Sequence, residues 1–585
     1  MVLLTAINAK YIHSNLAVYC LKAYADRKYR GKVSLAEFTI NNREEQILEK
    51  IYEKRPKVVA FSCYIWNIET VLSVAENLKK VLPEVMIILG GPEVSYNAGE
   101  ILCNYPAVDL VMRGEGEETF LEFLDCYIEK SRKLSDIPGL TYRKDDKIID
   151  TPDRGIMDLN KVAFPYRDMA HLENRIIYYE TSRGCPFSCS YCLSSIDKKV
   201  RLRDFDKVRK ELDFFLEKKV PQVKFVDRTF NCNHTHAYEI WKYIGEHDNG
   251  VTNFHFEISA DLLREEDFTL FQNFRKGLIQ LEIGVQSTNP KTIEAIRRKM
   301  DVKKVKEAVL RVHEGENIHQ HLDLIAGLPF EDYESFQNSF NDVYAMKPDQ
   351  LQLGFLKVLK GSYMGEEKDA YEVKYISRPP YEVLATKWLS YDDVLRLKQV
   401  EEMVEVYYNS FQFSASMAFL ENYHKSPFDL YEKLGQYYKK HGYFDGGISR
   451  SSRYNILQRY FEEEVEKKEE LDEIFREVLT YDLYLRDNVK NPPPFVKAWG
   501  KEENERLHAF YDREALEHKY LPDYSGYAPR QLSSMTHLRK FSLDMNSLLT
   551  EGKIRKETSY YLFDYKNRNP LNHSARVVKM EELYG

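Results

Sequence analysis

Cysteine is scarce in this sequence, and long apolar runs are absent. Only 8 of the 585 residues are cysteine, whereas secreted scaffolds that depend on disulfides are short and rich in cysteine. No run of about 18 apolar residues could span a bilayer, and the chain does not begin with the basic and apolar segments of a signal peptide. We therefore expect reduced thiols, no membrane span and a cytoplasmic location.

An excess of positive charge is also missing. The 84 lysines and arginines are outnumbered by 92 aspartates and glutamates, which leaves a formal net charge of −8 at pH 7. Bulk electrostatics therefore does not indicate a nucleic-acid partner. Hydrophobic residues at 43% and charged residues at 30% are ordinary for globular proteins and exclude a collagenous or mostly disordered chain. Because one hydrophobic core rarely exceeds about 300 residues, we expect several domains.

The first 130 residues alternate between strand and helix signals. Periodic segments predict helices between short apolar segments, and the latter predict strands at 2–7, 33–40, 58–62, 86–89 and 110–113. Short buried strands joined by helices predict right-handed βαβ units and a parallel sheet. We expect an N-terminal Rossmann-like, doubly wound α/β domain at residues 1–130, with a ligand beyond the carboxyl ends of its strands.

Three further regions follow along the chain. Residues 131–175 are expected to form a connector with a β-hairpin, and residues 176–370 return to β/α alternation. Parallel strands with crossover helices predict a central partial (β/α)6 barrel there. Residues 371–585 are expected to form a mainly α-helical C-terminal domain, with helices near 392–408 and 461–485 and a strand near 554–565.

Three cysteines lie close together directly after the first strand candidate of the barrel. Residues 183–192 read Arg-Gly-Cys-Pro-Phe-Ser-Cys-Ser-Tyr-Cys, so Cys185, Cys189 and Cys192 have CxxxCxxC spacing. Barrels place their sites at this end of a strand. Three thiolates can hold three irons of a cubane iron–sulfur cluster while the fourth iron stays open. Two alternatives remain, namely a zinc site with Cys232 as a distant fourth ligand and three structural cysteines.

This motif and its position resemble the signature of the radical S-adenosylmethionine (SAM) superfamily, in which CxxxCxΦC follows the first barrel strand. The resemblance implies a 4Fe-4S cluster held by Cys185, Cys189 and Cys192, which are then the metal ligands and the catalytic residues. It also implies that the open iron binds SAM and that one electron cleaves SAM to methionine and a 5′-deoxyadenosyl radical. A low-potential donor, flavodoxin or ferredoxin, would supply that electron. The other cysteines form no second cluster spacing, so we expect one cluster only.

The same resemblance implies SAM contacts along the barrel strands. Asp227 ends the second strand, where the family places a group for the SAM amine, although the usual Gly-Gly-Glu triplet is absent. Gln286 and Ser287 resemble the strand end that contacts the ribose in this family, and Tyr191 adds an aromatic side chain to the cluster motif. The residues themselves suggest two more contacts: a buried Glu257 could bind a ribose hydroxyl, and Arg298 could pair with the SAM carboxylate. Each of three residues also has a purely structural explanation. Asp227 also suits a turn at the end of a strand, Glu257 also suits an outward, solvated position, and Arg298 also suits a solvated helix face.

Gly90-Gly91-Pro92-Glu93 follows one strand of the N-terminal domain, and Arg113-Gly114-Glu115-Gly116-Glu117 follows the next. These two loops resemble those of cobalamin-binding domains fused to radical SAM barrels. Small residues there would let the backbone approach the corrin ring. The expected cofactor-binding residues of this domain are Asn8, His13, Ser62, Gly90, Gly91, Pro92, Glu93, Gly114, Glu115 and Gly116. The DxHxxG motif that supplies a histidine to cobalt in related domains is missing, which leaves the lower cobalt ligand open. Acidic residues after the second loop also suit a helix N-terminus without a ligand, and His13 also suits a loop hydrogen bond.

The resemblance covers residues 1–370, and residues 371–585 resemble a helical extension of unknown function. It implies a cobalamin-dependent radical SAM enzyme that methylates an unactivated carbon or a phosphorus centre. A second possibility keeps both cofactors but cyclises, rearranges or oxidises the substrate. A third is a non-catalytic protein that senses a cofactor or docks a partner. The substrate itself is not indicated by any motif.

Overall fold

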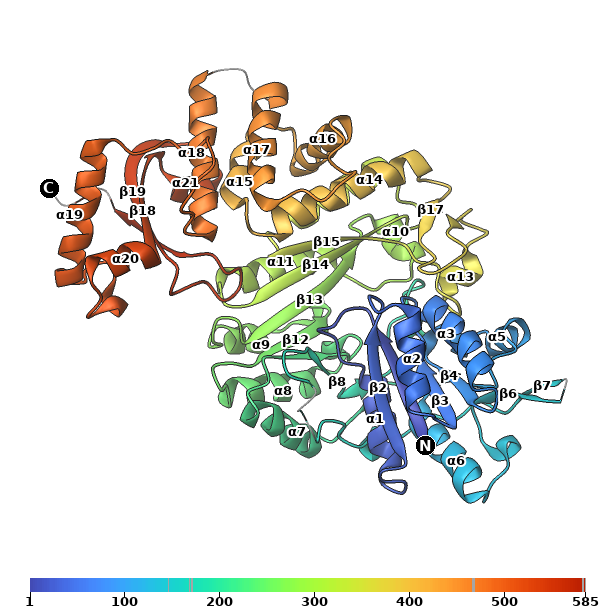
Figure 1. Ribbon diagram of the computed structural model, residues 1–585. Coiled ribbons are helices and arrows are strands. Elements are labelled where there is room, and N and C mark those ends of the chain that lie inside the picture. The colour runs from blue at the N-terminus through green and yellow to red at the C-terminus, as the bar shows by residue number, and fades with distance from the viewer. Residues whose placement is uncertain (146, 168, 170–171, 466–468, 581–582, 584–585) are drawn as a thin grey trace. The chain divides into compact units, whose positions relative to one another are not determined.

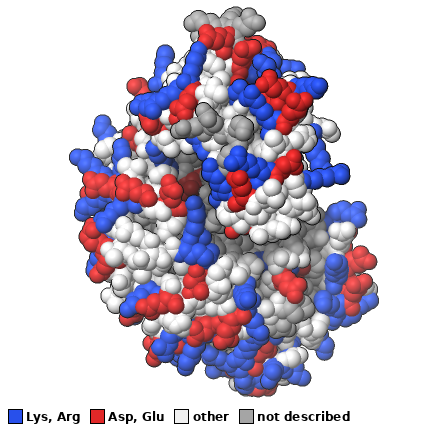
Figure 2. Space-filling model, turned by 90° about the vertical axis from the view of Figure 1, so that its left-hand side faces the viewer, with Lys and Arg blue, Asp and Glu red and all other residues white. Residues whose placement is uncertain are grey.

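The computed structural model describes residues 1–145, 147–167, 169, 172–465, 469–580 and 583 (Figure 1). The described residues form two compact units. The first unit comprises Met1–Ile318, Gly327–Asp332 and Phe355–Ser390, and the second comprises His319–Ala326, Tyr333–Gly354 and Tyr391–Gly585. Within the described chain, every helix is too short or too polar to cross a membrane. On the face shown in Figure 2, lysine and arginine side chains are interspersed with aspartate and glutamate.

An α/β sheet, blue to cyan in Figure 1, forms the N-terminal part of the first unit. The strand order is β2-β1-β3-β4-β5-β6-β7, with parallel pairs from β2 to β5. These parallel strands are β1 (Val2–Asn8), β2 (Val33–Thr39), β3 (Val58–Ser62), β4 (Met86–Gly90) and β5 (Leu110–Met112). The helices are α1 (Leu16–Ala25), α2 (Glu44–Glu53), α3 (Ile68–Val81), α4 (Pro92–Ser95), α5 (Ala98–Asn104) and α6 (Gly116–Leu124). The expected Rossmann-like fold is confirmed.

Alternating apolar residues explain why helices cover both faces of this sheet. On β1, Leu3 and Ile7 pack into the core beneath α2, α3 and α5, whereas Leu4 and Ala6 pack into the core beneath α1 and α6. Every residue of β1 is buried, as expected for a parallel strand covered on both sides. The expected hairpin, β6 (Leu140–Lys144) and β7 (Lys147–Asp150), extends the sheet antiparallel to β5. Residue 146 of that hairpin lies outside the described residues.

A second parallel sheet forms the central part of the first unit. Its strands β8 (Ile177–Tyr179), β11 (Gln222–Phe225), β12 (Asn253–Ile258) and β13 (Ile279–Gln286) pair in this order. The intervening helices are α7 (Phe205–Glu217), α8 (His234–Glu246), α9 (Glu265–Phe271), α10 (Pro290–Ala295) and α11 (Val302–Glu314). A short antiparallel pair, β9 (Ser182–Arg183) with β10 (Arg201–Leu202), brackets the loop that carries the three cysteines.

The last part of the first unit is the segment Phe355–Ser390, which we call the strap. It contains α13 (Tyr363–Glu367), β16 (Lys374–Tyr375) and β17 (Val383–Ala385), and the two strands pair antiparallel. Its backbone passes close to the N-terminal domain, because a Cβ at Gly361 would lie 2.5 Å from the Tyr96 ring.

The second unit combines helices with short sheets. It contains β14 (His319–Ala326), α12 (Tyr333–Tyr344) and β15 (Gln350–Phe355), and then α14 (Tyr391–Val404), α15 (Ser414–Glu421), α16 (Pro427–Lys440), α17 (Arg450–Tyr460), α18 (Glu469–Arg486), α19 (Lys501–Glu517), α20 (Pro529–Met535) and α21 (Met545–Glu551). Residues 466–468 of the helix expected at 461–485 lie outside the described residues. The strand expected at 554–565 is present as β19 (Lys556–Asp564), and it pairs antiparallel with β18 (Thr536–Leu543) and β20 (Arg576–Met580).

Candidate functional site

A large cavity lies at the carboxyl ends of strands from both sheets of the first unit. Its volume is about 1090 Å³, at the upper end of the range for small-molecule sites. Residues after β1, β3, β4 and β5 line it together with residues on and after β8, β11 and β12. Of the expected cofactor-binding residues, the cavity is lined by Asn8, His13, Ser62, Gly90, Gly91, Pro92, Gly114, Glu115, Gly116 and Glu257.

Part of the cavity lining is apolar and comes from inside the N-terminal domain. Leu4 and Ile88 contribute from one face of the sheet, and Leu21 and Phe120 contribute from α1 and α6, which cover that face. The lining therefore extends between the sheet and its helices. A space of this size, with an apolar floor and loops of small residues above it, fits a bulky and partly apolar cofactor such as cobalamin.

Gly91 shows why the loop after β4 requires glycine. Its φ of +117° lies in a region that side chains rarely adopt, and a Cβ there would lie 2.5 Å from the carbonyl oxygen of Cys63. Any other residue at this position would push the β4 loop away from the β3 loop. The cavity wall at this point is therefore bare backbone, as the close approach of a flat cofactor ring demands.

The polar residues after β1 are held by other protein groups. Asn8 donates to Glu37 Oε1 at 3.0 Å and to the carbonyl of His13 at 3.2 Å. The Nδ1 atom of His13 lies 2.7 Å from the hydroxyl of Tyr178 on β8. Burial lowers the pKa of His13, and the nearby Lys10 and Lys224 lower it further, so the imidazole is neutral near pH 7. His13 thus connects the N-terminal domain to the central sheet. This contact is a hydrogen bond within the protein, the alternative to a cobalamin contact that was named for His13 above.

Glu93 does not line the cavity, in contrast to the other residues of its loop. Its carboxylate is buried, accepts a hydrogen bond from the hydroxyl of Tyr381 and lies 3.1 Å from Lys360 Nζ. Both partners belong to the strap. Glu93 therefore joins the cavity loop to the strap rather than facing the cofactor, because its charge is satisfied by a cation and a hydroxyl of the protein.

The three motif cysteines lie in one loop whose backbone is tightly constrained. Gly184 has φ of +86°, and a Cβ there would lie 2.4 Å from the carbonyl oxygen of Lys199. The amide of Cys185 donates to the carbonyl of Asp197 at 2.8 Å. Burial raises the pKa of the Cys185 thiol, and Cys192 and Cys189 are near enough to raise it further. Three neighbouring thiols with different exposure fit the donor set of a cluster with one open iron.

Arg298 and Tyr191 contact each other beside this loop. Arg298 Nη1 lies 3.1 Å from the Tyr191 hydroxyl and 3.7 Å from Cys189 Sγ, and its Nη2 donates to the carbonyl of Gly284. Burial raises the pKa of Tyr191, so the hydroxyl stays protonated. The solvated helix face that was the alternative for Arg298 is wrong, because its guanidinium packs against the loop that carries the three cysteines.

Asp227 is tied to the backbone at the end of β8. The carboxylate is completely buried and accepts from the Thr181 amide at 3.0 Å and from the Thr181 hydroxyl at 2.5 Å. Burial raises the pKa of Asp227 to about 6, against the effect of these hydrogen bonds. In this geometry Asp227 stabilises the junction of two strands, which agrees with the structural role named above as the alternative to SAM binding. It has no exposed oxygen to offer an amine.

Gln286 and Ser287 at the end of β13 differ in how their polar atoms are satisfied. Ser287 is buried, and its hydroxyl donates to Glu331 Oε1 at 2.7 Å. Gln286 has φ of +73°, and its buried Oε1 has no hydrogen-bond partner among the described residues. A strained residue with an unsatisfied buried amide oxygen is a feature of ligand sites. Gln286 therefore fits a contact with a bound hydroxyl group, as the resemblance implied.

Sequence reasoning missed the cations that surround Glu257. Lys224 and Arg228 line the cavity with Glu257. Arg228 is ion-paired with Glu257, and Lys224 Nζ lies 4.0 Å from Glu257 and 2.8 Å from Glu282. The outward Glu257 considered above is therefore wrong. The alternation of Lys224 with the apolar Val223 and Phe225 on β11 was the signal that could have placed a cation on this face.

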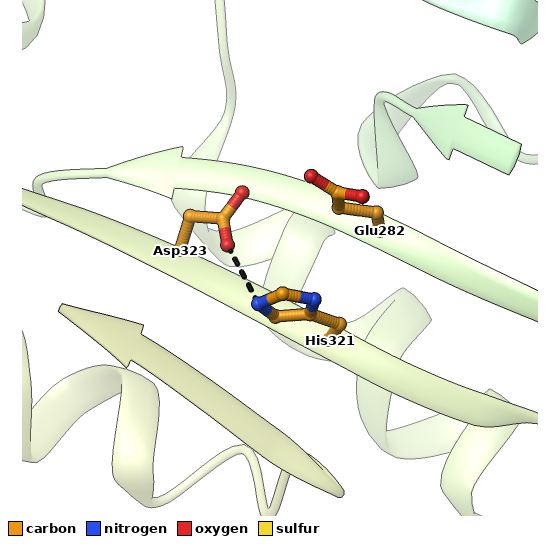
Figure 3. Close-up of side chains that lie close together, drawn as sticks. All are labelled: Glu282, His321 and Asp323. Carbon is orange, nitrogen blue, oxygen red and sulfur yellow. Dashed lines mark ion pairs between the residues drawn. The ribbon is translucent and has the colours of Figure 1, made fainter. Parts of the chain in front are cut away.

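On β14 of the second unit, His321 and Asp323 lie side by side (Figure 3). Their Nε2 and Oδ1 atoms are 3.0 Å apart. Asp323 therefore has a polar partner two residues away on its own strand, which is the spacing at which side chains share one face.

Family models match three successive parts of the chain. The B12 binding domain matches residues 2–124, the radical SAM superfamily matches residues 179–343, and a protein family of unknown function, DUF4080, matches residues 369–563. These matches agree with the cavity in the N-terminal part and with the cysteine loop in the central part. They remove the basis for the zinc alternative, because the matched superfamily binds a 4Fe-4S cluster and SAM.

Several characterised proteins are similar to this chain. The 2-(S-pantetheinyl)-carbapenam-3-carboxylate methyltransferase of Streptantibioticus cattleyicolor is 27% identical over 310 residues, covering 49% of this chain and 45% of the relative. An anaerobic magnesium-protoporphyrin IX monomethyl ester cyclase of Rubrivivax gelatinosus is 24% identical over 344 residues, covering 55% and 60%. The chain thus spans about half the length of the curated relatives it matches.

A solved structure shares the fold. The cobalamin-dependent S-adenosylmethionine radical enzyme OxsB, with aqua-cobalamin and S-adenosylmethionine bound, superposes with a TM-score of 0.58 at 16% identity. The match covers 82% of this chain and 78% of OxsB. At this level of identity the similarity shows a common fold.

Proposed function

Because this chain belongs to the cobalamin-binding radical SAM enzymes and uses a 4Fe-4S cluster, SAM and cobalamin, we propose that it methylates an unactivated carbon or a phosphorus centre of its substrate. The observation that carries the proposal is the shared cavity. Its lining comes both from the glycine loops of the N-terminal domain and from the strand ends of the central sheet. A methyl carrier held by one wall would therefore face a substrate held by the other.

When bound, cobalamin carries a methyl group, and the cluster with SAM supplies the radical that activates the substrate. The chain's own residues bind, orient and exclude water. We propose that Cys185, Cys189 and Cys192 hold the cluster, and that Gln286, Arg298 and Tyr191 lie near SAM. We further propose that the backbone at Gly90, Gly91, Gly114 and Gly116 supports the corrin ring, with Asn8, His13, Ser62, Pro92 and Glu115 around it.

The wall formed by Lys224, Arg228 and Glu257 supports a role in orienting the substrate. These charged groups face the cavity from β11, β12 and the loop after β11. A low-potential reductant is needed by every radical SAM enzyme, and we propose a flavodoxin or ferredoxin for this one. A relative that is a cyclase favours a second candidate, in which the same cofactors promote cyclisation, rearrangement or oxidation without methyl transfer.

The test uses anaerobically reconstituted protein with bound cobalamin, a chemical reductant and SAM labelled with CD3 on sulfur. Methylation predicts S-adenosylhomocysteine together with CD3 in the corrinoid fraction, both detected by mass spectrometry. Formation of 5′-deoxyadenosine without S-adenosylhomocysteine would instead support the second candidate. The Cys192→Ala variant is the control, because without a complete cluster 5′-deoxyadenosine must disappear.

A further inference from the structure

A buried pair of opposite charges joins the second cobalamin loop to the cluster loop. Glu117 lies in the first turn of α6, directly after the Gly114–Gly116 loop, and Arg183 lies on β9, two residues before Cys185. The Arg183 guanidinium contacts both carboxylate oxygens of Glu117, at 2.5 and 3.3 Å. Their side chains are only 17% and 5% exposed. Both residues also line the shared cavity.

The remaining donors of Arg183 extend this contact into a network. Its Nε atom lies 2.9 and 3.0 Å from the two carboxylate oxygens of Glu180, and its Nη1 lies 3.3 Å from Glu115. Glu115 in turn accepts from Arg201 at 2.5 Å and from the amide of Met157 at 2.8 Å. Two carboxylates of the cobalamin loop are therefore held by two arginines that flank the cluster loop.

The position of Arg183 also constrains Cys185. Gly184 between them has no room for a Cβ, so the backbone there is confined to one path. Asp197, whose carbonyl accepts the Cys185 amide, is itself ion-paired with Arg201. Arg201 and Arg183 are opposite one another in the β9–β10 pair. A displacement of the network would therefore move the first cluster ligand.

Glu117 and its neighbour Glu118 differ in how their carboxylates are held. An acidic residue in the first turn of any helix is stabilised by the helix dipole. The neighbouring Glu118 occupies such a position, and its carboxylate lies 3.4 Å from Arg154. Glu117 is buried instead, which opposes its ionisation, but Arg183 more than compensates and holds the pKa of Glu117 below its usual value. Buried ion pairs bring little net stability, and their best-attested use is to specify a geometry.

We propose that Arg183 is a positioning residue which, through Glu117 and Glu115, sets the separation and orientation of the cobalamin loop relative to the cluster loop. The proposal requires bound cofactors but no methyl transfer. Its failure is therefore distinguishable from failure of the proposed function.

The test is a distance measurement in the holoprotein. The reduced cluster and cobalt(II) cobalamin each carry an unpaired electron, so pulsed electron paramagnetic resonance reports their separation as a dipolar coupling. The wild-type holoprotein is expected to give a narrow distribution of distances. Glu117→Gln is expected to broaden or shift it and to lower cobalamin retention after gel filtration by roughly 10-fold, the scale of a lost supporting contact around a metal site.

Two further variants make the test decisive. Glu118→Gln removes the same charge from the next residue of the same helix, and it is expected to leave the distribution and the retention unchanged. Arg183→Lys keeps the charge but not the planar fork, and it is expected to give an intermediate width. Distributions of Glu117→Gln and Arg183→Lys that match the wild type would overturn the proposal. So would a loss of cofactors that is explained by a lower melting temperature of the cofactor-free protein, since the pair would then serve stability alone.

Discussion

Gly91 carries no side chain, so a bound group can approach the backbone closely at this point of the cavity. We expect Gly91→Ala to destabilise the first unit by about 2 kcal/mol and to weaken cobalamin retention, because a Cβ would meet the Cys63 carbonyl at 2.5 Å in a left-handed backbone. Urea unfolding and the visible spectrum after gel filtration measure the two effects. Gly99→Ala is the control, since its Cβ would meet open space on α5. Equal behaviour of the two variants would show that the loop tolerates a side chain.

Asp482 on α18 predicts a local dependence of stability on pH. Its buried carboxylate accepts from the amides of Ala415 and Ser416 and from the Ser416 hydroxyl, at 2.9, 2.8 and 2.6 Å. Burial raises its pKa from 3.8 to about 7. Between these values the folded state holds a proton that the unfolded chain has lost. Stability therefore falls by roughly 1.4 kcal/mol per pH unit as pH rises from 4 to 7, and it is constant above.

Hydrogen exchange of the start of α15, corrected for the intrinsic effect of pH, measures this dependence. Asp482→Asn cannot ionise, so hydrogen-exchange protection at the start of α15 is expected to become independent of pH in this variant. The protection is also expected to be lower than in the wild type, because one hydrogen-bond acceptor is lost. A wild-type protection that rises with pH in this range would contradict the assignment, because it would mean that the ionised form is the one stabilised by folding.

At single residues, local spacing was predictable from the sequence and distant partners were not. The CxxxCxxC spacing is a property of eight consecutive residues, and it was sufficient to predict where a cluster would bind. The partners of Glu93 lie in the strap, almost 300 positions later, and those of Asp227 lie at Thr181. No local pattern carries that information, which is why Glu93 was expected to face the cofactor and Arg183 was overlooked.

The strap is the element whose contacts predict an effect on the cavity loop. Tyr381→Phe removes the hydroxyl that donates to buried Glu93, at an expected cost of about 2 kcal/mol for a hydrogen bond to a charged group. Burial and Glu93 both raise the pKa of Tyr381, so this hydroxyl is protonated and able to donate. We expect faster tryptic cleavage within Phe355–Ser390 and faster cobalamin release. Tyr371→Phe is the control, because it removes a hydroxyl elsewhere in the strap. Cleavage of Tyr371→Phe as fast as that of Tyr381→Phe would argue against a specific role of the Tyr381–Glu93 hydrogen bond.

Among the elements, buried parallel strands were easier to predict than exposed antiparallel ones. β1 and β3 are mainly apolar and are buried throughout. By contrast, β18 alternates buried and exposed positions, and β20 has a single fully buried residue, Met580. Such strands have weak hydrophobic signals and depend on β19 for their pairing. The sequence therefore predicted β19 but not the sheet around it.

At the scale of the whole molecule, compact units do not follow the linear order of the chain. β14, α12 and β15 as far as Gly354 belong to the second unit, although loops on either side of them belong to the first. Compactness depends on contacts between residues far apart in sequence, so alternation of strand and helix signals could predict the fold class but not this division. The domain boundaries expected near residues 130, 175 and 370 stay a prediction.

This division predicts where cobalamin binding stabilises the protein. Every residue that lines the cavity belongs to the first unit. A ligand that binds only the folded state adds about 2.7 kcal/mol at 100 times its dissociation constant. We therefore expect cobalamin to slow hydrogen exchange in β1, β3, β4 and the loops after them, most strongly around Gly91 and Gly114. Peptides from Tyr391–Gly585 are expected to exchange at unchanged rates, and Gly91→Ala is expected to reduce the effect in the first unit. An equal increase of protection in both units would instead show that they unfold as one.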